Sequence, residues 1–425
     1  MKSLSSIATS NPAVWRSGIY PTKDKMKTGL RKQFAKVLSL PNVHYFGHVA
    51  VSAESAVSID DLRRFSPAAM VFSVGAQGTK KLGLPGETAR GVYPAKDFVY
   101  NYNLLPPFTA QDFSVGKRVA VVGMGNVMVD IAHWLLVDDP KRTTEEVIVV
   151  ARRGPFEAKF DKKEFNYIED CLDRTAFDAE LARIQPQLAA VGQDPGKLAE
   201  ETFPVLAKPA QAVKGGRLRF RFLCSPQSIQ AGADGRISRL TVVENVLHER
   251  DGNIACKATD KTADLEVDTM IFAIGDVADP AVGLPYNRDS YVTNPVVGED
   301  PKGPPHYELF DPKTGKIMPG MYAVGWARKA SEGLVGIARH DGEVGAAHVL
   351  KYLEGVSDSQ SACAQQVRQF LESKGVRVVD KSDLEPLGRA EEKIAQERGL
   401  TWFKFDQDDD MLAAIDANKA KTVSV

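Results

Sequence analysis

The sequence has few cysteines, and they are spread in a way that excludes several kinds of site. Cys171, Cys224, Cys256 and Cys363 lie far apart, with no Cys-x-x-Cys pair and no histidine at ligand spacing. This spacing disfavours a zinc site, an intrinsic iron–sulfur cluster and a disulfide framework, and it is typical of reduced thiols in a cytoplasm. We therefore expect a cytoplasmic protein without a metal centre.

Long apolar runs and an excess of one charge are also missing. The most apolar region, residues 119–137, is interrupted by Asn126, Asp130 and His133, whereas a membrane-spanning helix needs roughly 18 to 20 apolar residues in a row. The N-terminus lacks the apolar run of a secretory signal. With 54 basic and 55 acidic side chains the formal net charge is −1. This balance argues against electrostatic binding of nucleic acid by the chain as a whole. We expect neither a membrane nor a nucleic acid as a partner.

The most regular pattern present is a short hydrophobic run that ends in glycine. It occurs four times in the 425 residues, at 69–75, 118–123, 269–275 and 321–325. Runs this short and rich in Val, Ile and Phe predict buried strands. Ligands of doubly wound sheets lie beyond the carboxyl ends of the strands, where glycine permits close approach. Four such strand ends therefore predict nucleotide sites in an α/β protein of two or three domains.

Other segments predict the elements around these strands. The apolar spacing over residues 25–38 predicts an amphipathic helix. Alternation over 218–223 and the strand-forming residues of 237–246 predict antiparallel strands. Residues 184–216 are rich in Pro, Ala and Gly and are expected to form a surface excursion. The charged segment from Lys351 onward is expected to be a solvated tail.

The strongest single motif is RVAVVGMGNVMVDIAHWLL, at residues 118–136. It predicts a strand, a turn and an apolar helix. Gly123 permits the tight turn, and Gly125 allows the N–H groups at the helix start to approach a pyrophosphate. Met128 stands where a third small residue usually seats the helix against the strand, so looser packing is expected there.

The next predicted strand indicates which dinucleotide binds. Residues 146–151 (EVIVVA) are followed by Arg152 and Arg153, and not by the carboxylate that would bind a ribose 2′-hydroxyl. A guanidinium at this place holds a 2′-phosphate through charge-assisted hydrogen bonds. The pair therefore favours NADP(H) over NAD(H), although two solvated arginines at a strand end would give the same pattern.

Five segments together resemble one family, that of adrenodoxin reductase and its bacterial NADPH-ferredoxin reductase relatives: VVGMGNVMVDIA, VVARRGPFEAKFDKKEF, GMYAVGWARKASEGLVG, VGAQGTKKLGLPGE and VYPAKDFVYNYNLLP. They match in order and spacing from about Trp15 to the end of the chain. The resemblance implies an α/β fold with two Rossmann-like dinucleotide-binding domains, one for FAD and one for NADP. It would place residues 1–104 and 320–425 in the FAD-binding domain and 105–319 in the NADP-binding domain.

The resemblance also implies which residues bind the cofactors. Those implied at the NADP site are Gly123, Gly125, Asn126 and Val127 around the pyrophosphate, Arg152 and Arg153 at the 2′-phosphate, and Glu164 further along. The other implied cofactor-binding residues are Val14, Val51, Trp326, Gly333, Leu334 and Val335. Of these, Trp326 would lie beside the flavin, and 333–335 would form a turn whose amides face the flavin ring. Asp130 would be a catalytic acid near the flavin and nicotinamide, or else a helix carboxylate that faces solvent.

Departures from the family carry expectations of their own. Nothing before residues 11–15 resembles the family's first strand, glycine turn and helix, so the FAD-binding domain is expected to be incomplete at its N-terminus. The chain alone should then bind little FAD unless an N-terminal extension or a partner chain supplies that half. Lys23 stands where the family has a histidine, which puts an acid–base role at this position in doubt. The segment after Trp326 lacks the family's Gly-Pro and Thr-Asn pairs.

The implied function is a flavin-dependent oxidoreductase. NADPH would deliver a hydride to FAD, and a ferredoxin-like iron–sulfur protein would accept the electrons one at a time. Basic residues at 23–36 would either dock that partner or form a solvated helix face. Two alternatives stay open: an NADP(H)-binding or structural subunit without flavin, and an electron-transfer subunit like the glutamate-synthase small subunit. Gly275-Asp276 looks like a flavin-binding pair of disulfide reductases, but its place in the motif order predicts a return strand between the domains.

Overall fold

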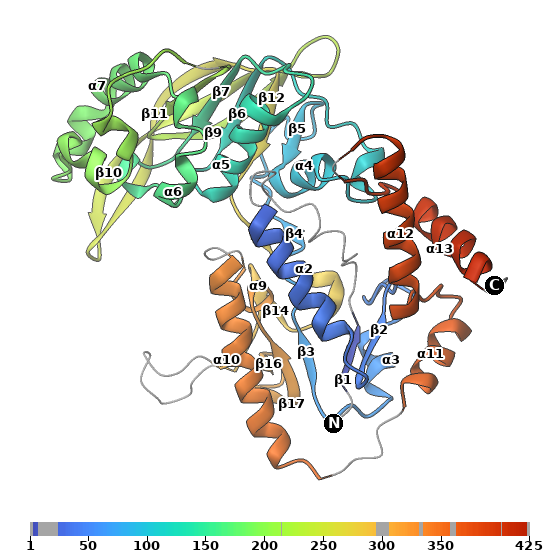
Figure 1. Ribbon diagram of the computed structural model, residues 1–425. Helices are drawn as coiled ribbons and strands as arrows, with labels where there is room; N and C mark the ends of the chain where they lie inside the picture. Colours follow the sequence, from blue (N-terminus) through green and yellow to red (C-terminus); the bar gives the residue numbers. More distant parts are fainter. Residues whose placement is uncertain are drawn as a thin grey trace. The chain divides into compact units, whose positions relative to one another are not determined.

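The chain forms two compact units, shown in Figure 1. The terminal unit comprises Met1–Thr79, Asn103–Thr109 and Gly275–Val425, and the inserted unit comprises Lys80–Tyr102 and Ala110–Ile274. The computed structural model describes residues 3–6, 24–213, 215–294, 306–330, 335–357, 363–400 and 402–422. Among them, no helix is both long enough and apolar enough to cross a membrane.

The units divide the chain at other points than the expected boundaries at 104 and 319, and strand pairing explains why. Strand β5 (Val92–Pro94) pairs in parallel with β12 (Thr269–Phe272), so the segment that holds β5 belongs to the inserted unit. Strand β13 (Asp276–Val277) pairs with β4 (Gly78–Thr79), which brings the chain back into the terminal unit well before residue 319.

The inserted unit is built on a five-stranded parallel sheet in the order β5-β12-β6-β7-β8. Strands β6 (Arg118–Val122) and β7 (Glu146–Val150) lie at its centre, where most of their side chains are buried. This confirms the strand predicted at 146–151 and, with β12, the strands predicted at the glycine-ending runs 118–123 and 269–275. Strand β8 (Arg217–Arg221) was expected to be antiparallel, but it pairs in parallel with β7. It is the edge strand, so its alternation reflects one buried face and one polar face.

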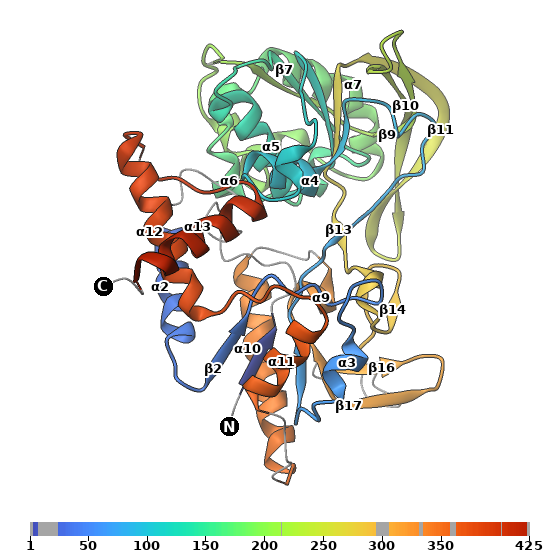
Figure 2. The ribbon, with the colours of Figure 1, turned by 90° about the vertical axis from the view of Figure 1, so that its right-hand side faces the viewer.

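A second, antiparallel sheet of the inserted unit has the order β11-β10-β9. Its strands are β9 (Cys224–Ala231), β10 (Ile237–Arg250) and β11 (Asn253–Glu266). Figure 2 shows these long strands side by side. The antiparallel strand predicted at 237–246 is therefore confirmed, and it extends further than its β-branched residues indicate.

Helices cover the parallel sheet. They are α4 (Ala95–Tyr102), α5 (Asn126–His133) with a π-helical continuation (Trp134–Asp138), α6 (Lys162–Phe165), α7 (Arg174–Ala190) and α8 (Leu198–Glu201). The surface excursion expected at 184–216 is wrong, because Ile184, Leu188, Leu198 and Phe203 are fully buried in the core. Pro186 lies within α7, which continues to Ala190, so it marks no break in the helix.

The terminal unit contains a parallel pair, β1 (Ser3–Ser6) with β2 (Val43–Phe46), and helix α2 (Asp24–Leu38) lies between them in the sequence. The helix predicted at 25–38 is confirmed. A strand therefore does precede residues 11–15, contrary to expectation. Its sequence, Ser-Leu-Ser-Ser, has a single apolar residue and gives no hydrophobic pattern for a strand prediction.

The main sheet of the terminal unit has the order β16-β17-β3, with β16 (Glu308–Asp311) antiparallel and β3 (Met70–Phe72) parallel to β17 (Lys316–Ala323). Helix α10 (Val335–Glu354) runs beside this sheet (Figure 1). The remaining short elements are α3 (Ile59–Arg63), β14 (Tyr286–Asn287), β15 (Ser290–Tyr291) and α9 (Trp326–Lys329). The strands predicted at 69–75 and 321–325 are confirmed.

The C-terminal segment is not a solvated tail. It forms α11 (Ala364–Ser373), α12 (Lys381–Glu397) and α13 (Asp408–Thr422), and α13 lies against α12 in both views. Val367 and Leu371 pack into a core cluster with Phe46, and Ile415 packs against Tyr45. The high content of charged residues led to the prediction of a solvated tail. One apolar residue every three or four positions is nevertheless enough to bury one face of a helix.

Candidate dinucleotide site

The glycine turn between β6 and α5 is fixed by packing at its first glycine. Gly123 has φ +117°, a conformation that other residues rarely adopt. A Cβ atom at this position would overlap the carbonyl oxygen of Ala273, which follows β12. The N–H of Gly123 donates to the carbonyl of Val150 at 3.0 Å. Gly123 is therefore required by the fold itself.

Gly125 is different, because nothing in the fold requires a glycine there. It is the N-cap of α5 with extended backbone angles (φ −113°, ψ −173°), and a Cβ atom would meet nothing within 4 Å. The space in front of the helix start is thus open. The first N–H groups of α5, those of Asn126 and Val127, have no acceptor within the helix. This arrangement suits an anionic group that approaches the turn.

Met128 packs more closely than the sequence predicts. It is fully buried in the core of the inserted unit, together with Val119 and Val121 of β6. The expectation of loose packing is wrong because a long, unbranched thioether side chain fills irregular gaps between a helix and a sheet.

The loop after β7 is tied to the glycine turn by two hydrogen bonds. The side-chain oxygen of Asn126 accepts from the N–H of Asp161 at 2.7 Å. The N–H of Lys159 donates to the carbonyl of Met124 at 2.9 Å. Asp161 in turn caps α6 by accepting from the N–H of Lys163 at 2.8 Å. The side-chain oxygen of Asn126 therefore holds the loop, while its backbone N–H and its side-chain N–H groups are the donors that a ligand could use.

Arg152 and Arg153 lie at the carboxyl end of β7, as predicted, and their charges are uncompensated. Arg152 is exposed and Arg153 is half-buried. Within the part of the chain that the structure describes, neither guanidinium has a hydrogen bond or an ion pair. The arginines of the neighbouring strand are paired instead: Arg219 contacts Glu146 at 2.9 Å and Arg221 contacts Glu180 at 3.4 Å.

The acid nearest in sequence does not neutralise this pair. Glu157 accepts the N–H of Gly154 at 2.9 Å through one carboxylate oxygen and the side-chain amide of Gln193 at 2.5 Å through the other. Among the described residues, neither arginine of this pair therefore has a counter-ion. An anionic ligand would supply the missing charge.

Asp130, on the second turn of α5, is buried and not solvent-facing. Only 5% of it is exposed, and one of its carboxylate oxygens has no hydrogen-bond partner among the described residues. Burial raises the pKa of Asp130 to about 9, and the nearby Glu164 carboxylate adds to the shift. Asp130 is therefore a neutral acid at pH 7, and its reading as a solvated helix carboxylate is wrong.

This shifted pKa gives a pH-dependent stability that can be measured. Between about pH 4 and pH 9 the folded state keeps a proton on Asp130 that the unfolded state releases, so the burial cost of Asp130 grows as the pH rises. Asparagine does not titrate, so the variant Asp130→Asn does not bear this growing cost. The free energy of unfolding of the variant minus that of the parent should therefore increase by roughly 1 kcal/mol for each pH unit in this window. Urea unfolding at several pH values checks it, with the exposed Asp178→Asn as control. A pH-independent difference would contradict the buried, neutral acid.

One sequence-predicted residue of the terminal unit, Trp326, lies at a different turn. Trp326 begins α9 after Gly325, whose φ is +63°. The N–H of Gly325 donates to Asp341 at 2.7 Å, and Asp341 also pairs with Arg328, which lies over the ring of Tyr307 at 4.3 Å.

The other predicted residues of the terminal unit are less fully placed. Val51 is half-buried and packs against two core clusters of the unit. Val335 is the first residue of α10. Val14, Lys23, Gly333 and Leu334 lie outside the described residues.

The Arg328–Asp341 pair should stabilise this turn strongly, because less than a tenth of either side chain is exposed. Asp341→Ala would leave a buried guanidinium without its partner and is expected to lower the free energy of unfolding by about 3 to 5 kcal/mol. Asp416→Ala, which breaks the half-exposed pair with Arg377, should cost under about 1 kcal/mol. Urea denaturation of both variants tests the difference. Equal losses of unfolding free energy in the two variants would mean that the buried pair contributes no more to stability than the half-exposed pair.

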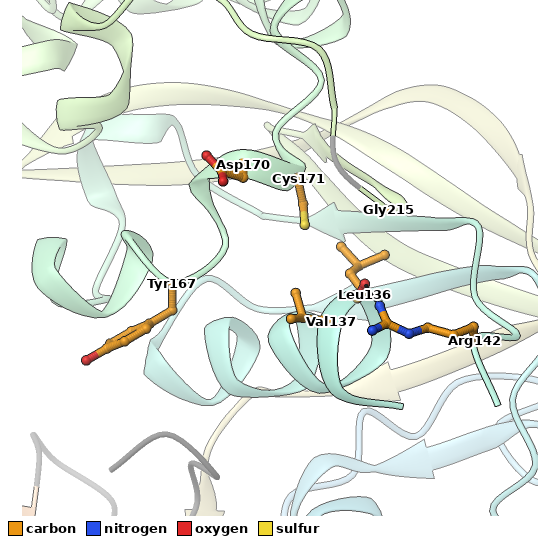
Figure 3. Close-up of a pocket in the computed structure, with 7 residues that line it drawn as sticks. All are labelled: Leu136, Val137, Arg142, Tyr167, Asp170, Cys171 and Gly215. Atoms are coloured by element: carbon orange, nitrogen blue, oxygen red, sulfur yellow. Dashed lines mark hydrogen bonds between the residues drawn. The ribbon is translucent and has the colours of Figure 1, made fainter. Parts of the chain in front are cut away.

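A cavity of about 270 Å³ opens near the other end of the α5 segment. Figure 3 shows the residues that line it: Leu136, Val137, Arg142, Tyr167, Asp170, Cys171 and Gly215. The eight residues of α5, about 12 Å of helix, separate it from the glycine turn. Arg142 donates to the carbonyl of Leu136 at 3.3 Å, and burial raises the pKa of Cys171 to about 11. No helix start lines this cavity, so it is not the dinucleotide site.

The structure therefore brings eight of the predicted residues into the inserted unit, and it places Val51, Trp326 and Val335 in the terminal unit. The eight are Gly123, Gly125, Asn126, Val127, Asp130, Arg152, Arg153 and Glu164. Lys159 and Asp161, which hold the loop after β7, were not predicted, because their contribution is made through backbone N–H groups that leave no pattern in the sequence.

Comparison with known proteins finds relatives along nearly the whole chain. NADPH-ferredoxin reductase FprA from Mycobacterium leprae (strain TN) is 29% identical over 430 residues, which cover 93% of this chain and 88% of the relative. NADPH:adrenodoxin oxidoreductase from Bos taurus is 26% identical over 435 residues, 93% of this chain and 83% of the relative. No protein-family model matches the chain.

A solved structure agrees with these relatives. Mycobacterium tuberculosis FprA in complex with NADPH superposes with a TM-score of 0.75 at 26% identity, covering 95% of this chain and 89% of that one. The resemblance based on the five motifs is confirmed. In sequence and in fold, the chain is thus a relative of the NADPH-ferredoxin reductases and the NADPH:adrenodoxin oxidoreductases.

Proposed function

We propose that this protein is an NADPH-dependent flavoprotein oxidoreductase that transfers electrons to a ferredoxin-like iron–sulfur protein. The observation that carries the proposal is the uncompensated Arg152 and Arg153 pair beside the open turn at Gly125. A cofactor with a pyrophosphate and a 2′-phosphate matches both features. The names of the relatives, which are NADPH-dependent reductases, support the same function.

The residues of the inserted unit fit NADP(H). The backbone N–H groups of Asn126 and Val127 would bind the pyrophosphate, because the helix start leaves them without acceptors. Arg152 and Arg153 would bind the 2′-phosphate. Asp130, neutral at pH 7, would hold a proton at its carboxyl group near the nicotinamide end, with Glu164 beside it in the same site.

The terminal unit offers a comparable edge for FAD. Strands β3 and β17 are parallel, with Phe72 opposite Ala323, so both end at the same edge of the sheet. Each is followed within three residues by a glycine of positive φ, Gly75 and Gly325. These strand ends fit a dinucleotide that approaches the backbone closely.

At this edge we place FAD, with Trp326 and Val51 among its contacts; Val14, Gly333, Leu334 and Val335 remain predicted contacts. When bound, FAD supplies the redox chemistry, since it takes a hydride from NADPH and gives up electrons singly. The chain's own part is to hold nicotinamide and flavin in position and to keep water away from them.

We propose that the electron acceptor is acidic, because helix α2 presents exposed lysines. Lys32 and Lys36 are exposed on this helix, one turn apart, and exposed apolar residues Phe34 and Val37 lie next to them. A cationic face with apolar contacts suits an acidic iron–sulfur protein, whose association would be fast at low salt. Reversing both charges, in Lys32→Glu with Lys36→Glu, should slow electron transfer to a ferredoxin while leaving transfer to ferricyanide unchanged.

Steady-state assays with added FAD test the proposed function. We expect NADPH-dependent reduction of ferricyanide and of a [2Fe–2S] ferredoxin, and much slower reduction with NADH. If NADPH binds but no acceptor is reduced and no FAD is retained, the alternative of an NADP(H)-binding subunit without flavin holds. If NADPH does not bind, the proposal fails altogether.

A further inference from the structure

Asn245 is a buried amide that reaches from the antiparallel sheet to the end of β7. It lies in β10, at an irregularity in the pairing with β11, and is only 4% exposed. Its backbone N–H donates to the carbonyl of Leu223 at 2.7 Å. These contacts fix the position of the residue independently of its side chain.

Both protons of the Asn245 side chain are used. The side-chain nitrogen donates to the carbonyl oxygen of Arg152 at 2.8 Å and to the hydroxyl oxygen of Ser225 at 2.9 Å. The assignment of nitrogen and oxygen in the amide follows from these partners, since a carbonyl oxygen accepts only from a donor.

Among the described residues, the hydrogen-bond partner of the Arg152 carbonyl is Asn245. The backbone groups of Ala151 and Arg153, on either side, instead bond to β8 and to the residues that follow β8. The N–H of Ala151 donates to Arg221, and the carbonyl of Ala151 accepts from Cys224, both at 3.0 Å. The carbonyl of Arg153 accepts from Leu223 at 3.3 Å. Among the described residues, the carbonyl of the peptide between Arg152 and Arg153 is therefore held by a side chain of the other sheet, whereas the peptides on either side are held by backbone hydrogen bonds.

We propose that Asn245 is a positioning residue for recognition of the 2′-phosphate, a role that rests on the proposed function. No side chain within the described ranges fixes the guanidinium of Arg152, so its position depends on the backbone that carries it. When the peptide is held in place, the side chain of Arg152 starts from a fixed point at the strand end, and less freedom is lost when its guanidinium binds a phosphate. Asn245 itself touches neither guanidinium in the structure and acts through the Arg152 carbonyl.

The test compares NADP⁺ with NAD⁺ in the full-length protein. Calorimetric titration of Asn245→Ala should show a dissociation constant for NADP⁺ raised roughly threefold to tenfold, the size of one lost hydrogen bond, and one for NAD⁺ changed less than twofold. The fragment 2′,5′-ADP should follow NADP⁺. Ser225→Ala is the matched control, because it removes the other partner of Asn245 and keeps the bond to Arg152; its ratio of the two constants should equal that of the parent.

A double-mutant cycle separates positioning from general support of the sheet. In the Arg152→Ala background, Asn245→Ala should change the NADP⁺ to NAD⁺ ratio less than twofold, since the side chain through which it acts is gone. If Asn245→Ala does not fold, Asn245→Ser replaces it, because serine is too short to reach the Arg152 carbonyl. An equal loss for NADP⁺ and NAD⁺, an unchanged ratio, or an undiminished effect in the Arg152→Ala background would overturn the inference. A parent protein without preference for NADP⁺ would instead overturn the proposed function, and the inference with it.

Discussion

Gly125→Val is expected to abolish NADP(H) binding while the thermal unfolding midpoint of the ligand-free protein stays nearly unchanged. The backbone at Gly125 is extended, which valine adopts readily, and a Cβ atom there meets nothing within 4 Å. The branched side chain would instead fill the space in front of the start of α5, where the pyrophosphate must approach. Calorimetric titration with NADP⁺ and differential scanning calorimetry measure the two effects.

The neighbouring glycine provides the matched contrast. Gly123→Ala should lower the thermal midpoint markedly, because Gly123 has φ +117° and its Cβ would overlap the Ala273 carbonyl. Gly125 is thus expected to be needed for ligand binding, and Gly123 for the stability of the fold. Binding of NADP⁺ by folded Gly125→Val would mean that the nucleotide lies elsewhere.

Arg152→Ala should weaken NADPH binding roughly tenfold to a hundredfold or more and barely alter NADH binding. Each charge-assisted hydrogen bond to a phosphate is worth about 1.5 to 3 kcal/mol, and the exposed guanidinium of Arg152 has no other partner among the described residues to lose. Dissociation constants for both cofactors, measured side by side, provide the test.

Arg219 is a suitable control for this variant. It lies in the middle of the edge strand β8 of the same sheet, opposite Ile148 of β7, and it pairs with Glu146 at 2.9 Å. Arg219→Ala should leave the binding of both cofactors unchanged. Equal losses for NADPH and NADH in Arg152→Ala would show that the arginine does not read the 2′-phosphate.

The central motif of the inserted unit could be predicted from the sequence because its signals are local. A run of buried β-branched residues, two glycines and a helical apolar pattern follow one another within nineteen residues, and each has a separate physical cause. The roles of the two glycines could not be separated in this way. Their difference depends on Ala273, which lies about 150 residues further along the chain.

Two of the wrong predictions share one cause, which is that composition was taken as a sign of exposure. Residues 184–216 contain enough Pro, Ala and Gly for a loop, yet Ile184 and Leu188 are one helical turn apart and both are buried. The charged C-terminal segment likewise hides Val367 and Leu371, again one turn apart. In both places the spacing of a few apolar residues decides the structure.

Asn245 illustrates what no local pattern reveals. It stands among alternating residues of a long strand, and nothing in that strand distinguishes it from a solvent-facing amide. Its role follows only when the end of β7 is folded against the antiparallel sheet, which brings its amide to a carbonyl 93 residues away. Contacts of this kind depend on tertiary structure.

The proposed NADPH-dependent flavin reduction is tested most directly by an anaerobic titration of the FAD-supplemented protein with NADPH, in which the flavin absorbance is monitored. Because β1, α2 and β2 supply a strand–helix–strand unit that the sequence did not reveal, we expect added FAD to stay bound to the purified protein and to be bleached by NADPH. NADH at the same concentration should bleach it far more slowly. A protein that binds NADPH but leaves the flavin unbound or oxidised would contradict this proposal.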